Sequence, residues 1–66
     1  MNIAKLKAKI VEKGMNVETL GELIRVERST LYRKLNNFEK ITVGEAVKMK
    51  EALGLSDAEA NDIFLS

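Results

Sequence analysis

The chain has 66 residues, of which 45% are hydrophobic and 32% charged, with eleven basic and ten acidic side chains. This length allows one small domain and excludes a second, and the composition is too apolar and too balanced in charge for a disordered chain. Cysteine and histidine are absent, which excludes disulfides, thiolate or imidazole metal sites and the commonest general base. We therefore expect one folded domain over residues 1–66 that is not an enzyme, has no catalytic residues and uses no metal or cofactor.

Proline is absent and there are four glycines, a composition that favours helices over loop-rich folds. The longest apolar run covers residues 63–65, too short for a membrane span or for the apolar stretch of a secretory signal. We expect a cytoplasmic protein that does not bind membranes. Positive charge lies in two blocks, residues 1–13 and 28–40, each with four basic side chains and one acidic side chain.

The first half of the chain predicts two helices. Ile3, Leu6 and Ile10 form an amphipathic stripe over residues 3–13, which Gly14 ends. Asn16 is a favourable N-cap for a second helix of about two turns that runs to residue 24. Glycine costs about 0.5–1 kcal/mol in a helix interior. Because position 21 in this helix is glycine, we expect another helix to approach it closely.

The second half predicts three more helices. Residues 27–37 place Leu31 and Leu35 four apart on a buried face, and we expect Phe38 and Ile41 to hold the following loop against the core. Capping boxes at residues 42–45 and 56–59 begin the last two helices, and Gly54 ends the first of them. Their apolar residues at helical spacing are Val43, Ala46, Val47, Met49, Leu53, Ala60, Ile63 and Phe64. The predicted fold is all-α, a compact bundle of five short helices.

The second and third helices are joined by a turn of only three or four residues, a spacing typical of a helix-turn-helix. Their shared core would contain Leu20, Leu23, Ile24, Val26, Leu31 and Leu35. With those positions buried, the third helix exposes Arg28, Ser29, Tyr32 and Arg33, flanked by Thr30 and Lys34. Arginine can donate two hydrogen bonds to guanine O6 and N7 in the major groove, and hydroxyl groups can pair with donors or acceptors. Residues 28–36 are therefore a candidate DNA recognition helix.

The pattern Leu20-Gly21-x-x-Ile24-x-Val26-x-x-x-Thr30-Leu31, after a basic helix and before two capped helices, resembles the lambda-repressor-like (Cro/CI-type, XRE-like) helix-turn-helix family. The resemblance covers nearly the whole chain and is strongest to small phage-borne transcriptional regulators. It implies that Arg28, Ser29 and Arg33 read bases. It also implies phosphate or flanking contacts from Asn16, Thr30, Tyr32, Lys34, Asn36, Asn37, Lys40 and Thr42.

Three positions depart from the family's pattern. Val17 stands where a glutamine often opens the first motif helix, so Asn16 would have to replace that phosphate contact. Arg25 stands at a turn position that is frequently glycine, so we expect a left-handed or otherwise unusual backbone there at some cost in strain. Glu27 stands at the N-cap of the recognition helix, where it favours the helix dipole but repels phosphate.

These features predict a sequence-specific double-stranded DNA-binding regulator, of the Cro or repressor kind, in a bacterial cell or phage-infected host. A homodimer on a two-fold symmetric operator is expected, because one helix in one half-site buries too little surface for tight binding. Phe64 and Leu65 are candidate dimer contacts, although core packing is the simpler role for Phe64. No small-molecule ligand is evident.

The alternative is a protein-interaction module, such as a phage antirepressor or adaptor that reuses the fold. The small net charge of +1 and the acidic N-cap favour this alternative. The cluster of Arg28, Arg33, Lys34 and Lys40 favours DNA.

Overall fold

Capping side chains mark where most of the helices begin. The computed structural model describes residues 1–36 and 39–65, and this part of the chain forms five helices: α1 (Ile3–Glu12), α2 (Val17–Ile24), α3 (Arg28–Leu35), α4 (Val43–Leu53) and α5 (Asp57–Phe64). Four of them follow a residue whose side chain accepts a hydrogen bond from the backbone N–H three positions on, namely Asn2, Asn16, Thr42 and Ser56. The expected all-α class, the five helices and both capping boxes are confirmed.

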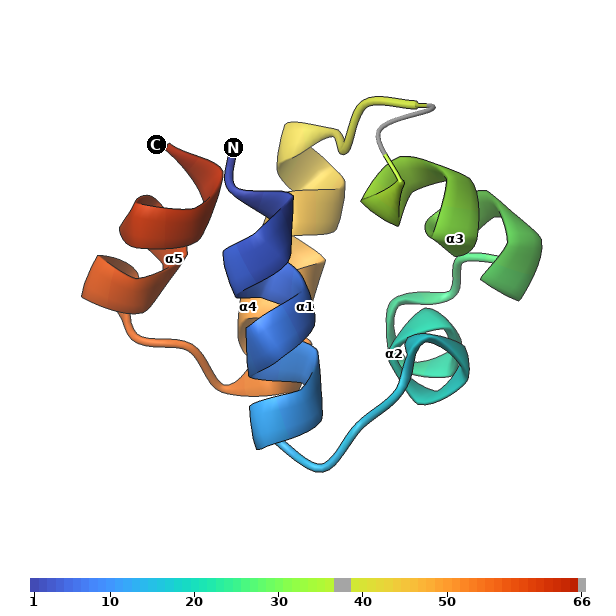
Figure 1. The fold of residues 1–66 in the computed structure, drawn as a ribbon, viewed down its shortest axis with the longest axis horizontal. Coiled ribbons are helices and arrows are strands. Elements are labelled where there is room, and N and C mark those ends of the chain that lie inside the picture. Colours follow the sequence, from blue (N-terminus) through green and yellow to red (C-terminus); the bar gives the residue numbers. More distant parts are fainter. Residues whose placement is uncertain (37–38, 66) are drawn as a thin grey trace.

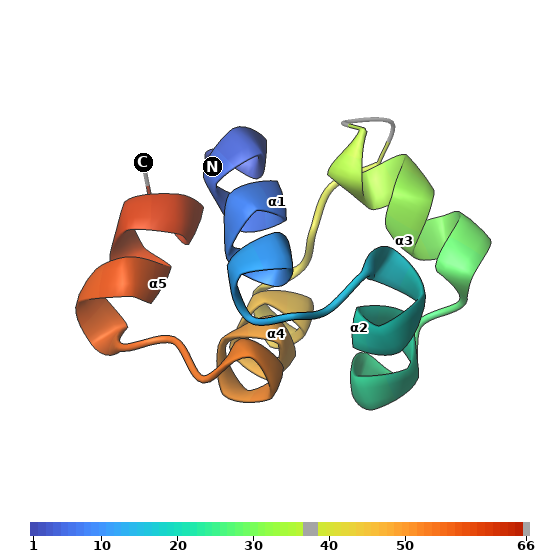
Figure 2. The ribbon, with the colours of Figure 1, turned by 60° about the horizontal axis from the view of Figure 1, so that its bottom comes forward.

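The helices are arranged around a central pair. α1 and α4 occupy the middle of the molecule, with α5 on one side and α2 and α3 on the other (Figure 1). Figure 2 shows the same order after a turn of the molecule, with the start of α1 and the end of α5 close together. α2 packs against both α4 and α3. None of the helices in the described part of the chain is long and apolar enough to cross a membrane.

One apolar core joins all five helices. Its buried members are Leu6, Ile10, Leu20, Ile24, Leu31, Leu35, Met49, Leu53, Leu55 and Ile63, with Ile41 and Phe64 partly buried against them. The expected burial of Leu31, Leu35, Met49 and Leu53 is confirmed. Phe38 lies outside the described residues.

Three apolar side chains lie outside the core, contrary to the spacing argument. Leu23 was expected beside Leu20 and Ile24, but it is exposed at the edge of α2, next to Lys48 and Ala52 of α4. Val43 and Val47 are also exposed. Helical spacing identifies which residues share a stripe, but the width of the stripe that is covered depends on which helix packs against it.

Gly21 allows the turn between α2 and α3 to fold back onto α2. A Cβ atom at this position would lie 2.8 Å from the backbone carbonyl oxygen of Val26 and 3.6 Å from a methyl group of Leu31. The position is crowded as expected, but the prediction that a helix makes the closest approach is wrong: the nearest atom belongs to the turn, and α3 is only in ordinary contact through Leu31. The Val26 N–H also donates to the Gly21 carbonyl oxygen at 2.9 Å. The glycine therefore fixes how tightly the three-residue connection can close.

Arg25 ends α2 in the left-handed conformation that the sequence predicts, with φ 58° and ψ 45°. An L-residue with a Cβ atom is disfavoured there, whereas glycine is not. We expect Arg25→Gly to be about 0.5–1 kcal/mol more stable than Arg25→Ala, because both remove the same charge but only glycine relieves the backbone. Urea denaturation of the two variants measures this difference. Equal stability would show that the turn is not strained at this residue.

Ion pairs join the two ends of the chain. The Asn2 N–H donates to the Ile63 carbonyl oxygen at 2.7 Å, the Lys5 ammonium lies 2.7 Å from Asp62, and the Lys9 ammonium lies 2.6 Å from Glu59. The hydrogen bond from Lys9, together with those from the Ser56 N–H and hydroxyl, lowers the pKa of Glu59 to about 2. These contacts hold α1 beside α5.

The low pKa of Glu59 makes the ion pair between Lys9 and Glu59 sensitive to acid. A carboxyl group whose pKa is lower in the folded state stabilises the fold above its unfolded pKa of about 4.5, and that stabilisation is lost as the pH falls toward 2. We expect the stability difference between wild type and Glu59→Gln to shrink over this pH window, as measured by urea denaturation at each pH. Glutamine can keep the capping box. Parallel stability curves for the two proteins would contradict the assignment.

Candidate functional site

α3 presents a polar face to solvent along its length. Leu31 and Leu35 anchor the helix in the core, which leaves the other side of α3 exposed. The side chain of Arg28 is 63% exposed and that of Arg33 is 50% exposed. The side chains that we expected on this face, Arg28, Ser29, Tyr32 and Arg33, are all exposed. α3 begins at Arg28, directly after Glu27, as the sequence predicts. Glu27 makes no side-chain hydrogen bond to the first turn of the helix.

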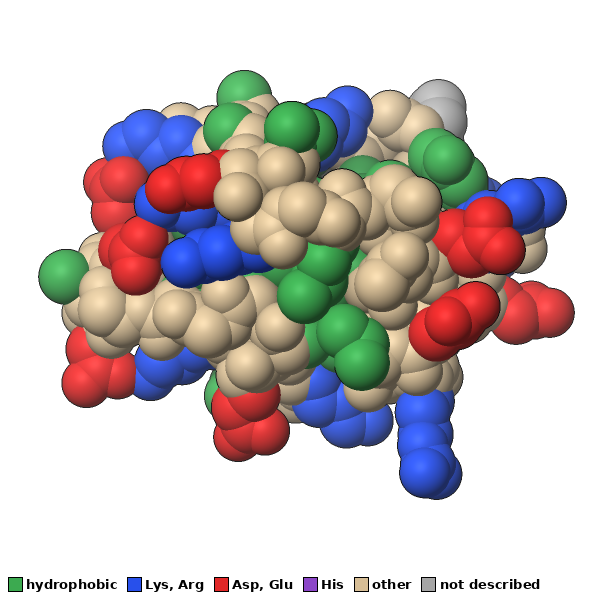
Figure 3. Space-filling view, turned by 90° about the horizontal axis from the view of Figure 1, so that it is seen from below, with side chains coloured by type: hydrophobic (Ala, Val, Ile, Leu, Met, Phe, Trp, Pro, Cys, Tyr) green, Lys and Arg blue, Asp and Glu red, His purple; other side chains and the backbone are tan. Residues whose placement is uncertain are grey.

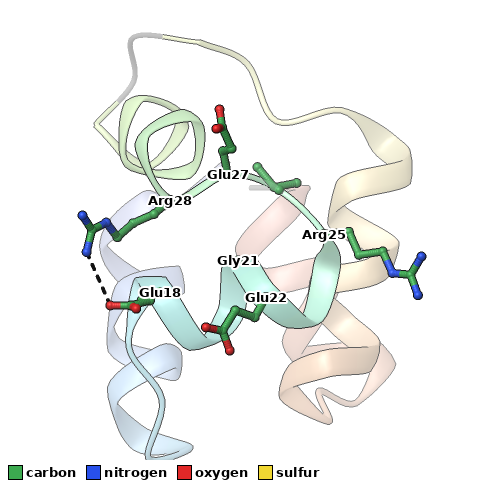
Figure 4. A pocket seen from close by; sticks show the side chains of 7 residues that line it. Glu18, Gly21, Glu22, Arg25, Glu27 and Arg28 are labelled. Carbon is green, nitrogen blue, oxygen red and sulfur yellow. Dashed lines mark hydrogen bonds and ion pairs between the residues drawn. The ribbon is translucent and has the colours of Figure 1, made fainter.

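Arg28 and its acidic partner lie at the start of this face. Its Nη1 lies 3.4 Å from Glu18 Oε2 on the first turn of α2, and Figure 4 shows the two side chains turned toward each other. Both groups are mostly exposed, so this ion pair contributes little to stability and can exchange for another partner.

The opening between α2 and α3 carries charges of both signs. Its volume is about 430 Å³, and its lining includes three carboxylates, Glu18, Glu22 and Glu27, beside Arg25 and Arg28. Figure 4 shows the Arg25 side chain turned away from Arg28. No group of carboxylates within residues 1–36 and 39–65 has an arrangement that could hold a metal ion. The opening is therefore a surface of mixed charge beside α3.

Arg33 is held at two points. Its Nε donates to Glu39 Oε1 at 2.8 Å, and its Nη2 donates to the Thr30 hydroxyl at 3.3 Å. Glu39 lies in the segment that leads from α3 to α4, whereas Thr30 is one turn earlier on α3 itself. The guanidinium is thus held beside the helix while it is still half exposed. Glu39 lies six positions from Arg33, and Glu18 lies ten positions from Arg28. Neither carboxylate was identified from the sequence as a partner of these arginines.

Lys34 differs from the sequence expectation. It was expected among the exposed side chains that flank the recognition face, but its side chain is only 11% exposed. The ammonium lies 3.0 Å from Glu45 Oε1 and donates to the Lys40 carbonyl oxygen at 3.1 Å. Lys34 therefore ties the end of α3 to the start of α4 and to the segment between them.

The carboxylate of Glu45 accepts from several donors at once. It receives the Thr42 N–H at 2.9 Å in the capping box as well as the Lys34 ammonium. Burial of the carboxyl raises the pKa of Glu45, but the hydrogen bonds from Thr42 and Lys34 outweigh it, so the pKa lies below its ordinary value. Glu45 is ionised at neutral pH, and the Lys34 charge is matched inside the fold.

The other candidate contacts have different surroundings. The side-chain Oδ1 of Asn16 caps α2 by accepting from the Thr19 N–H at 2.8 Å, and Thr42 caps α4. Asn16, Asn36, Lys40 and Thr42 are all exposed. Asn37 lies outside the described residues. The structure therefore leaves four of the flanking candidates on the surface, in addition to Tyr32.

Lys7 adds a basic group that the sequence did not single out. Its ammonium lies 3.4 Å from the Asn36 side-chain oxygen at the end of α3. Lys7 and Tyr32 also line, with Asn16, an open depression of about 230 Å³ between α1, α2 and α3. The first basic block of the sequence thus meets the second at this point. Only the packing of α1 near α3 makes this visible, because no local pattern relates residues so far apart.

The proposed dimer residues at the C-terminal end also differ from each other. Phe64 is partly buried against the core, which supports the packing role considered for it. Leu65 is exposed directly after α5.

Comparison with family models, curated proteins and solved structures gave no match to this chain.

Proposed function

We propose that the protein is a sequence-specific double-stranded DNA-binding regulator in which α2 and α3 form a helix-turn-helix. The observation that carries this proposal is the exposed side of α3, which presents Arg28 and Arg33 outward while Leu31 and Leu35 hold the helix to the core. The connection of three residues between α2 and α3 closes tightly over Gly21. A helix held in this way can enter a major groove so that its N-terminal residues contact the base edges.

The contacts divide into base-reading and phosphate-binding groups. In this proposal Arg28, Ser29 and Arg33 face the bases, since they project from the outer side of α3. Phosphate contacts come from exposed side chains around this face, namely Lys7, Asn16, Tyr32, Asn36, Lys40 and Thr42. Lys34 is left out because its ammonium is used by Glu45. Thr30 is assigned to holding Arg33 rather than to DNA.

A homodimer would place two copies of α3 on a two-fold symmetric operator. The exposed Leu65 is the candidate contact between copies, whereas Phe64 is already used in the core.

A random-sequence DNA selection with the purified protein tests the function. We expect enrichment of one motif, with two-fold symmetry if the protein binds as a dimer. Binding to the selected site should also weaken as salt rises, because phosphate contacts release counterions. Failure to enrich any motif at low salt would remove the proposal.

The second candidate function is a protein-interaction module. It is favoured by the exposed apolar side chains Leu23, Val43 and Val47 on α2 and α4, and by the carboxylates beside the start of α3. Figure 3 shows hydrophobic side chains gathered near the middle of one face, with acidic and basic groups around them. A protein partner bound through apolar side chains would give affinity that depends little on salt, and no DNA motif would be selected.

A further inference from the structure

The two exposed arginines of α3 engage their carboxylates through different nitrogen atoms. An arginine side chain has five N–H donors, one on Nε and two each on Nη1 and Nη2. Glu39 and Thr30 take Nε and Nη2 of Arg33, which lie on one edge of the guanidinium. Glu18 instead takes Nη1 of Arg28. The edge of the guanidinium that stays open for another acceptor therefore differs between Arg33 and Arg28.

The geometry matters because a bidentate contact to guanine uses two neighbouring N–H groups of the guanidinium. Among residues 1–36 and 39–65, no partner contacts Nη1 of Arg33, so the terminal edge of the group, formed by Nη1 and Nη2, can donate while Glu39 holds the edge that carries Nε. In Arg28 the contact with Glu18 is made by Nη1 at 3.4 Å, so Nε and Nη2 form the edge that Glu18 does not contact.

We propose that Glu39 is a positioning residue that holds Arg33 with its terminal edge free to read a guanine. This inference rests on the proposed DNA binding. Fixing a long side chain before binding reduces the entropy that is lost when it meets its base, and immobilising one such side chain costs roughly 2- to 10-fold in affinity. Glu39 also adds a negative charge beside the proposed DNA-facing side of α3, so we expect it to lower affinity for DNA of any sequence.

The test uses three variants that each remove one negative charge. Glu39→Gln removes the negative charge that holds Arg33, Glu18→Gln removes the one beside Arg28, and Glu51→Gln changes an exposed residue on α4 that touches neither arginine. Affinities are measured for the selected site and for a site in which the base pair read by Arg33 is changed. That base pair is the one at which Arg33→Ala loses preference.

We expect Glu39→Gln to lower the preference at that base pair roughly 2- to 10-fold, while all three variants bind random DNA slightly more tightly. Glu18→Gln and Glu51→Gln should keep the preference unchanged. In the Arg33→Ala background, Glu39→Gln should have no further effect on preference, which a general loss of structure would not reproduce.

The outcomes separate the inference from the function on which it rests. If the wild-type protein selects no motif, the DNA-binding proposal fails. If it selects a motif and Glu39→Gln keeps the full preference at that base pair, the role of Glu39 is wrong while the function stands. If Glu18→Gln lowers the preference at that base pair and Glu39→Gln does not, Glu18 rather than Glu39 supports the contact there and the inference is overturned.

Discussion

Arg33→Ala is expected to weaken binding to the selected DNA site by about 1–3 kcal/mol, or roughly 5- to 150-fold, because a bidentate contact to guanine is lost. Affinity for random DNA should fall much less, since that binding depends on phosphates. The side chain of Arg33 is half exposed and its ion pair with Glu39 is a surface pair, so stability should change by no more than about 0.5 kcal/mol.

Lys48→Ala provides the matched control for this prediction. It removes one positive charge from an exposed position on α4, outside the proposed contacts. We expect it to weaken binding to the selected site and to random DNA only slightly and to the same extent. Competition binding at fixed salt gives both affinities for each variant. Equal losses on specific and random DNA for Arg33→Ala would make Arg33 a phosphate contact instead of a base reader.

The helices could be predicted from the sequence because their signals are local. Capping boxes at residues 42–45 and 56–59 act within one turn, and Gly54 ends α4 in the left-handed conformation. The unusual backbone at Arg25 and the crowding at Gly21 could also be predicted, since both follow from the backbone demands of a short turn, although the segment that crowds Gly21 was expected to be a helix. Each of these signals depends on residues at most a few positions apart.

Contacts between distant residues could not be predicted in the same way. Lys34 looks like an exposed basic residue in the sequence, and only the position of α4 shows that its ammonium meets Glu45. The carboxylates of Glu18 and Glu39 likewise become partners of the α3 arginines only after the chain has folded. The sequence therefore identified the exposed arginines of the candidate site but not the groups that orient them.

Lys34→Met is expected to lower the free energy of unfolding by about 2–3 kcal/mol, because it leaves the carboxylate of Glu45 without its ammonium partner. A fully buried pair costs roughly 3–5 kcal/mol to break. The side chain of Glu45 is 18% exposed and keeps its hydrogen bonds with Thr42, which reduces the loss. Domains of this size have only about 3–10 kcal/mol of stability, so this loss would be a substantial fraction of the total.

A second replacement separates the unpaired charge from the loss of packing. Lys34→Met combined with Glu45→Gln leaves no buried charge, methionine keeps the aliphatic stem of lysine, and glutamine can still complete the capping box with Thr42. We expect the double variant to recover most of the stability lost by Lys34→Met in urea denaturation. Lys48→Met, at an exposed site, should stay within about 0.5 kcal/mol of wild type. Additive losses in the double variant would mean that Lys34 stabilises the fold through its stem and its bond to the Lys40 carbonyl, rather than through Glu45.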